Sequence, residues 1–154
     1  MPRRFWLMKT EPDEVSIDDL AAAPLQTLPW TGVRNYQARN FIRDQMQPGD
    51  GVLFYHSSCP QPGIAGLALI ASESEADCTQ FDPHSPYYDP KSSPPQPRWL
   101  QIEVRLERKT RLLALSSLRQ ASELSTMQVL KRGNRLSVTP VTAPEWCAVL
   151  ALLE

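Results

Sequence analysis

Residues 98–108 constrain the fold more than any other stretch of the chain. Polar or charged residues there alternate with apolar ones at Leu100, Ile102, Val104 and Leu106. Successive side chains of a strand point to opposite faces of its sheet, so a period of two predicts a strand with one buried face. The chain must therefore build a sheet and cover at least one side of it.

The remaining apolar patterns add strands and short helices to this sheet. Further strands are predicted at residues 3–10, 52–55, 64–72 and around Leu136 and Val138. Helices are predicted at residues 17–23, after Asn35 as N-cap, at 116–121, at 125–132 and at 143–152. About five or six strands with four or five short helices indicate an α+β fold, a small barrel or twisted sheet with helices at its ends.

A proline-rich stretch at residues 77–97 interrupts the pattern. It holds six prolines, which exclude a regular helix or a central strand. Loops this long inside a compact domain are usually functional or disordered. We interpret it as a loop that either closes over a binding pocket or shields an edge of the sheet.

Length and charge exclude several classes of protein. The 154 residues suit one domain, which we take as residues 1–154, and the apolar runs are too short to cross a membrane. The net charge of −1 argues against a protein that coats nucleic acid. Residues 98–135 nevertheless hold nine basic and three acidic side chains, a net +6 that leaves −7 for the rest. This asymmetry is compatible with one basic face, or with solvated charges alone.

The three cysteines show no metal-binding or disulfide spacing. Cys59, Cys78 and Cys147 lie far apart, which favours free thiols in a cytoplasmic protein. We expect no metal and no cofactor.

Five segments together resemble the EVE domain family, which belongs to the PUA-like superfamily and includes thymocyte nuclear protein-like members. Residues 30–40 (WTGVRNYQARN) carry the strongest signature. The other four, in family order, are residues 6–12, 48–57, 82–92 and 133–141. The resemblance implies a β-pseudobarrel of five to six strands flanked by short helices. It also implies a non-catalytic module that recognises a modified cytosine in DNA, or alternatively RNA.

Residues Trp30, Val33, Arg34 and Asn35 form the centre of the predicted pocket. Trp30 could stack on a flipped-out base, a contact that contributes about 1–3 kcal/mol. Arg34 beside the start of a helix at Asn35 could hold a phosphate, a base carbonyl or an anionic buffer molecule. The alternative is structural: Asn35 only caps its helix, and Arg34 pairs with Asp44 or Glu11.

Two other segments supply further candidate pocket residues. Tyr55, His56 and Ser57 end a buried strand, where His56 could read the edge of a base or serve only as a structural histidine. Tyr87 and Tyr88, in the proline-rich loop, could close the pocket opposite Trp30.

Basic residues complete the prediction. Lys9 ends the first strand and could line the pocket if the first and last strands are neighbours. We predict that three basic residues contact the phosphate backbone, namely Lys131, Arg132 and Arg135. The alternative function is an enzyme or sensor for a small nucleotide-like ligand, with His56 as its candidate reactive group, although no catalytic triad is recognisable.

Overall fold

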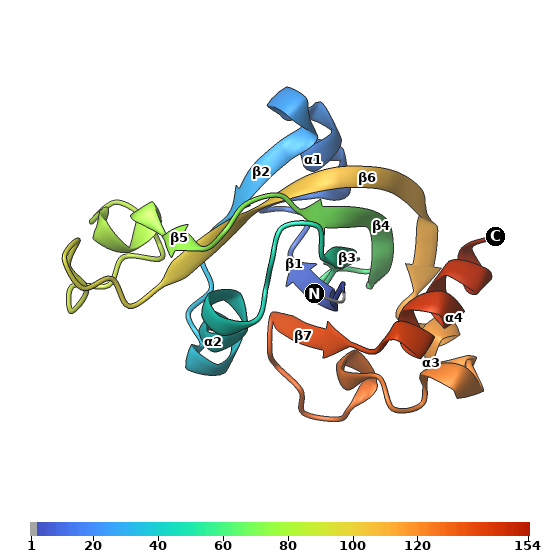
Figure 1. Cartoon of the computed structure of the whole chain (residues 1–154). Helices are drawn as coiled ribbons and strands as arrows, with labels where there is room; N and C mark the ends of the chain where they lie inside the picture. Colours follow the sequence, from blue (N-terminus) through green and yellow to red (C-terminus); the bar gives the residue numbers. More distant parts are fainter. Residues whose placement is uncertain (1–2) are drawn as a thin grey trace.

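The computed structural model describes residues 3–154, which form one curved sheet with helices on both sides (Figure 1). Seven strands contribute, in the order β2-β6-β4-β3-β1-β7, with β5 paired to β6. Their bounds are β1 (Phe5–Thr10), β2 (Thr27–Trp30), β3 (Gly51–His56), β4 (Gly63–Ile70), β5 (Glu75–Ala76), β6 (Leu100–Ala114) and β7 (Val138–Val141). The α-helices are α1 (Ile17–Ala22), α2 (Tyr36–Asp44), α3 (Leu115–Gln120) and α4 (Ala143–Leu153). Four 3₁₀ turns are η1 (Pro24–Gln26), η2 (Cys78–Phe81), η3 (Ser122–Leu124) and η4 (Gln128–Leu130).

The sheet is mixed and does not close into a barrel. β1 and β3 run parallel, and the other neighbouring pairs are antiparallel. Within residues 3–154, β2 and β7 are the two ends of the strand order and do not pair with each other. Each carries a proline, Pro29 or Pro140, which lacks the N–H that a central strand needs. The predicted α+β class is confirmed. The predicted pseudobarrel of five to six strands is instead an open sheet of seven strands.

Both faces of the sheet are buried. On one face, Trp6, Met8 and Phe54 pack with Ile42 of α2 and Leu20 of α1. On the other face, a second core includes side chains of β1, β3, α3 and α4, namely Leu7, Leu53, Leu118, Trp146 and Val149. Double coverage explains why β1 and β3 are continuous apolar runs instead of alternating patterns.

Local signals located most helix starts correctly. Asn35 caps α2 by accepting from the N–H of Ala38 at 3.1 Å. The predicted capping boxes open α1 at Ser16 and α4 at Thr142. The helix predicted at residues 125–132 was wrong, since only the short turn η4 forms there. The strand β2 was not predicted, because it has only four residues and one of them is Pro29.

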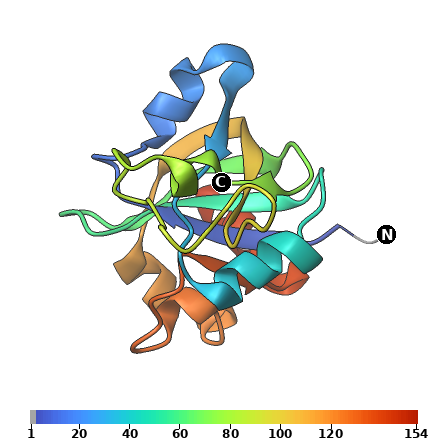
Figure 2. The same cartoon turned by 90° about the vertical axis from the view of Figure 1, so that its left-hand side faces the viewer.

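The proline-rich stretch is an ordered loop that packs beside α2 and the start of β6 (Figure 2). Its anchor is Gln80, whose side chain is fully buried. The Gln80 amide nitrogen donates to the carbonyls of Asp77 and Trp99, and its oxygen accepts from the N–H groups of Arg98 and Trp99. These bonds replace regular secondary structure and hold the loop next to the cavity described below.

Candidate functional site

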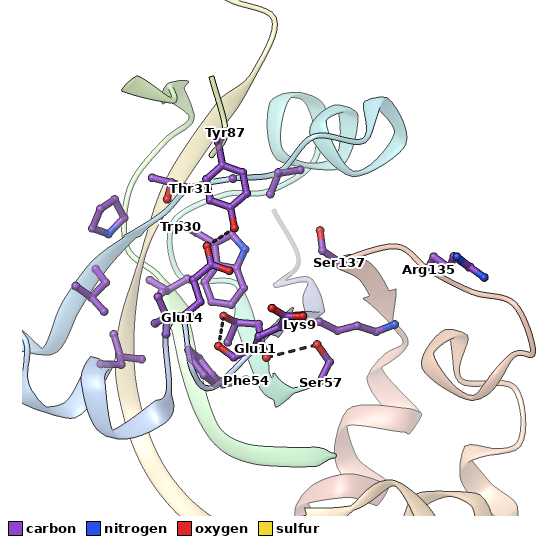
Figure 3. A pocket seen from close by; sticks show the side chains of 18 residues that line it. Lys9, Glu11, Glu14, Trp30, Thr31, Phe54, Ser57, Tyr87, Arg135 and Ser137 are labelled. Carbon is purple, nitrogen blue, oxygen red and sulfur yellow. Dashed lines mark hydrogen bonds between the residues drawn. The ribbon is translucent and has the colours of Figure 1, made fainter. Parts of the chain in front are cut away.

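A cavity of about 250 Å³ opens between the end of β1, the strand β2, the helix α1 and the proline-rich loop (Figure 3). Its lining combines aromatic, acidic and basic side chains. The residues that give it this character are Lys9, Glu11, Glu14, Trp30, Phe54, Ser57, Tyr87, Arg135 and Ser137. A concave site with a few converging polar groups is the usual form of a small-ligand site.

Two aromatic residues from distant segments frame the cavity. Trp30 ends β2, is 7% exposed and meets Phe54 edge to face at 5.5 Å between ring centroids. Tyr87 comes from the proline-rich loop and packs over Gly32, just beyond Trp30 (Figure 3). The structure thus brings Trp30 and Tyr87 together at one cavity, while their role in binding stays a prediction.

The Tyr87 hydroxyl donates to the carboxylate of Glu14, which follows β1 in the chain. Burial, together with this bond, raises the pKa of Tyr87 to about 12. The phenol therefore stays protonated at neutral pH and keeps its donor role. The contact joins the proline-rich loop to the segment before α1 across the cavity.

Lys9 is the basic group that the fold places at this cavity. β1 and β7 are antiparallel neighbours, which meets the condition set for Lys9 to line the pocket, and the Lys9 N–H donates to the carbonyl of Ser137 at 2.8 Å. The ammonium group is half-buried, and burial lowers its pKa. Within residues 3–154 it has neither a hydrogen bond nor an ion pair. A desolvated, unpartnered ammonium that faces a cavity is free to bind a ligand acceptor.

Arg34 does not line the cavity, which corrects the predicted anion site. Its guanidinium is bound to the fully buried carboxylate of Asp77 at 3.1 Å. It also donates to the Tyr87 carbonyl at 2.7 and 3.0 Å and to the Thr79 hydroxyl at 3.0 Å. Its donors are thus used to fix the proline-rich loop. Arg34 does form an ion pair, as the structural alternative expected, but its partner is Asp77 and neither Asp44 nor Glu11.

Asp77 was missed by the sequence reasoning although it organises this region. Its carboxylate also accepts from the Gly32 N–H at 2.8 Å and from Thr79. It therefore connects the turn after Trp30 with the loop that carries Tyr87. The local role of Asp77 as the N-cap of η2 does not reveal its other partners, because Gly32 and Arg34 lie more than 40 residues away in the chain.

Three other predicted pocket residues lie elsewhere. Asn35 serves as the cap of α2 and does not line the cavity. Tyr55 belongs to the core on the opposite face of the sheet, because it alternates with Phe54 along β3. Tyr88 is 42% exposed and also lies outside the cavity lining. By contrast, Val33 and Ser57 do line it.

His56 is a structural residue in this fold. Its Nε2 accepts a hydrogen bond at 3.1 Å from the N–H of Ile17, which is the first residue of α1. Burial, aided by nearby Lys109 and opposed by Asp18, lowers its pKa. His56 borders a separate surface hollow with Asp18, Cys59 and Lys109. The predicted reading of a base edge by His56 is not supported by this position.

The predicted phosphate contacts divide into two groups. Arg135 lines the cavity beside Ser137, whereas Lys131 and Arg132 lie exposed on the segment before β7. Glu11, Glu14 and Phe54 were not predicted as lining residues. Glu11 and Phe54 fall inside two of the five matched segments, which was the only available signal.

Two classes of feature are absent from residues 3–154. No helix there combines the length and apolarity needed to span a membrane. No group of three or more histidine, cysteine or acidic side chains in that range is arranged to hold a metal ion.

The comparisons with known proteins each cover nearly the whole chain. The EVE domain profile matches residues 4–152. Human thymocyte nuclear protein 1 is 43% identical over 97% of this chain and 73% of its own length. A crystal structure of a Pseudomonas syringae protein superposes with a TM-score of 0.93 and 46% identity, covering 97% of this chain and 99% of that one.

Two solved complexes contain nucleic acid. The human THYN1 protein in complex with 5-methylcytosine-containing DNA has a TM-score of 0.91 and 43% identity, covering 98% of both chains. The YTH domain of Zygosaccharomyces rouxii MRB1, in complex with N6-methyladenosine RNA, has a TM-score of 0.57 and 16% identity over 98% of this chain and 84% of that one. The second likeness concerns the fold alone.

Proposed function

The chain belongs to the EVE domain family, and from this premise we propose that it is a nucleic-acid-binding module that takes a flipped-out, modified base into the cavity. A 5-modified cytosine in DNA is the favoured ligand, and RNA is the second candidate polymer. The observation that carries the proposal is a cavity with aromatic, acidic and basic walls in a chain 43% identical to a protein solved with 5-methylcytosine DNA.

The polar groups of the cavity suit the hydrogen-bonding edge of cytosine. Cytosine carries an exocyclic amine that donates, and carboxylates are the side chains that accept from it. Glu11 and Glu14 supply such carboxylates, and Lys9 supplies a donor for the acceptors of the same base. Thymine and uracil present an oxygen in place of the amine, so their approach to a carboxylate is unfavourable. The cavity should therefore prefer cytosine-type bases.

The aromatic walls supply the affinity that the net charge of −1 does not. Stacking of a base on Trp30 or Tyr87 would contribute about 1–3 kcal/mol, comparable with the few kcal/mol needed to unstack it from a duplex. Arg135, with Lys131 and Arg132, would contact the phosphate backbone. Because these contacts are few, we expect a modest dependence of affinity on salt.

An enzyme or small-ligand sensor has less support. The candidate reactive residue His56 lies outside the cavity and its Nε2 is engaged by Ile17. The proposal assigns no catalytic residue and no cofactor. A cytoplasmic location stays a prediction.

The test is equilibrium binding of matched oligonucleotides that carry cytosine, 5-methylcytosine or thymine at one position. Wild type should bind the 5-methylcytosine strand most tightly. Glu14→Gln should reduce the preference for cytosine over thymine, whereas Glu73→Gln, an exposed control that does not line the cavity, should not. Equal affinity of wild type for all three strands would overturn the proposal.

A further inference from the structure

The turn between α1 and β2 presents a leucine to solvent. Leu25 is 90% exposed, the highest value among the exposed large apolar side chains. It has φ 55° and ψ 18°, and the next residue, Gln26, has φ 51°. The left-handed region is unfavourable for a branched residue such as leucine. Leu25 thus belongs to neither core and occupies a backbone conformation that its side chain disfavours.

The turn is nevertheless held in place. The Gln26 N–H donates to the Ala23 carbonyl at 2.8 Å, and the Thr27 hydroxyl donates to the Leu25 carbonyl at 2.9 Å. Figures 1 and 2 show α1 and the start of β2 projecting from the sheet, with this turn at the outer end. The side chain of Leu25 is therefore displayed at a defined position on a projection.

The projection adjoins the cavity. Leu20 of α1 and Leu28 and Trp30 of β2 line the cavity, one element on each side of the turn. Leu25 precedes Leu28, which lines the cavity, by three residues.

The chemistry around the turn suits the inside of a base stack and its phosphate border. Residues 20–30 contain no charged side chain. Arg105 of β6 lies directly across from Thr27 in the sheet and is exposed. The β2 side of the projection therefore combines an apolar tip with a cation, which suits a base stack and its phosphate border. The acidic residues of the projection, Asp18 and Asp19, lie on α1, and Asp18 pairs with Lys109.

We propose that Leu25 is a wedge that enters a duplex and fills the space left by the flipped nucleotide, with Arg105 at the adjacent phosphate. Apolar side chains inserted between base pairs are an established way to stabilise unstacked DNA. The turn keeps its strained leucine because the side chain is buried only in the complex. This inference rests on the proposed function, because a wedge is needed only if a base leaves a duplex.

The test compares a duplex containing one 5-methylcytosine with the same strand alone. Leu25→Asn keeps a residue that tolerates the left-handed region but removes the apolar tip. Duplex affinity should fall about tenfold or more, as expected for a buried leucine side chain. Single-strand affinity should stay within about twofold. Leu25→Met, the matched control, should bind both nearly as wild type does.

Thermal unfolding of each variant checks that the fold is intact, which the exposure of Leu25 leads us to expect. If Leu25→Asn binds the duplex as tightly as wild type does, or loses both ligands equally, the wedge is wrong while base recognition stands. If wild type binds neither ligand, the proposed function fails and the wedge with it.

Discussion

Gly32 and Tyr87 are in contact so close that only a glycine fits. A Cβ at Gly32 would lie 2.7 Å from the Tyr87 ring, and Gly32 has φ +84°. Gly32 belongs to the turn after Trp30, and Tyr87 belongs to a loop more than 50 residues later. The missing side chain therefore lets an aromatic ring settle beside Trp30 at the cavity.

We predict that Gly32→Ala weakens binding of the modified base by displacing the Tyr87 ring. Gly49→Ala is the matched control, since Gly49 has φ +95° but a Cβ there would meet no atom of residues 3–154 within 4 Å. Both variants should lose about 1–2 kcal/mol of unfolding free energy from the left-handed backbone. Only Gly32→Ala should also lose affinity. Equal affinities for the two variants would contradict the assigned role of Tyr87.

Asp77→Ala should be the most destabilising of these substitutions. The fully buried carboxylate holds Arg34, Gly32 and Thr79, and its removal leaves a guanidinium without its charge partner. Breaking such a pair costs about 3–5 kcal/mol. Urea unfolding measures the loss. Asp44→Ala, which breaks the exposed pair with Arg43, should change stability little; a similar loss in both would count against the Asp77 network.

Lys9→Met should stabilise the fold and weaken binding together. Burial lowers the pKa of Lys9, so the folded state disfavours the charged ammonium relative to the unfolded chain. For wild type, the free energy of unfolding should consequently rise as pH rises from the folded pKa toward the unfolded value. The methionine variant should lack this rise. A variant that is less stable at neutral pH and binds normally would argue that Lys9 is structural.

His56→Gln should remove an acid sensitivity of the fold. The pKa of His56 is lowered below 6.5, and protonated Nε2 cannot accept from the Ile17 N–H. As pH falls below the unfolded value of about 6.5, the unfolded chain binds the proton first, so the wild type loses stability. Glutamine keeps an acceptor without titrating. Unfolding curves between about pH 7.5 and 5.5, roughly one unit either side of the reference value, should diverge for wild type and His56→Gln. The exposed residue His84 is the control, and His84→Gln should follow wild type.

Local patterns predicted the elements whose residues carry their own signal. The alternation from Leu100 to Leu106 located β6, and Asn35 located the start of α2. The strand β2 was missed because Pro29 is a turn signal in sequence but an edge residue in the sheet. Local patterns of this kind indicate the conformation of a segment but not which other segment it pairs with.

Only part of the candidate site was predictable from the sequence. Trp30, Lys9 and Tyr87 do meet at the cavity, but Arg34 is occupied by Asp77, 43 residues away. Strand period separates Tyr55 from Phe54, so naming Tyr55 as a pocket residue placed it on the wrong face. The carboxylates of Glu11 and Glu14 reach the cavity through tertiary folding, which no spacing in the chain reveals.

The most direct test of base recognition is to remove the base from the ligand while keeping the nucleic-acid backbone. Wild type would be titrated with a strand containing one 5-methylcytosine and with the same strand carrying an abasic site there. If the cavity holds the base, the abasic strand should bind at least about tenfold more weakly, the equivalent of one lost stacking contact. Equal affinities would show that the backbone alone is recognised and would contradict base recognition in this cavity.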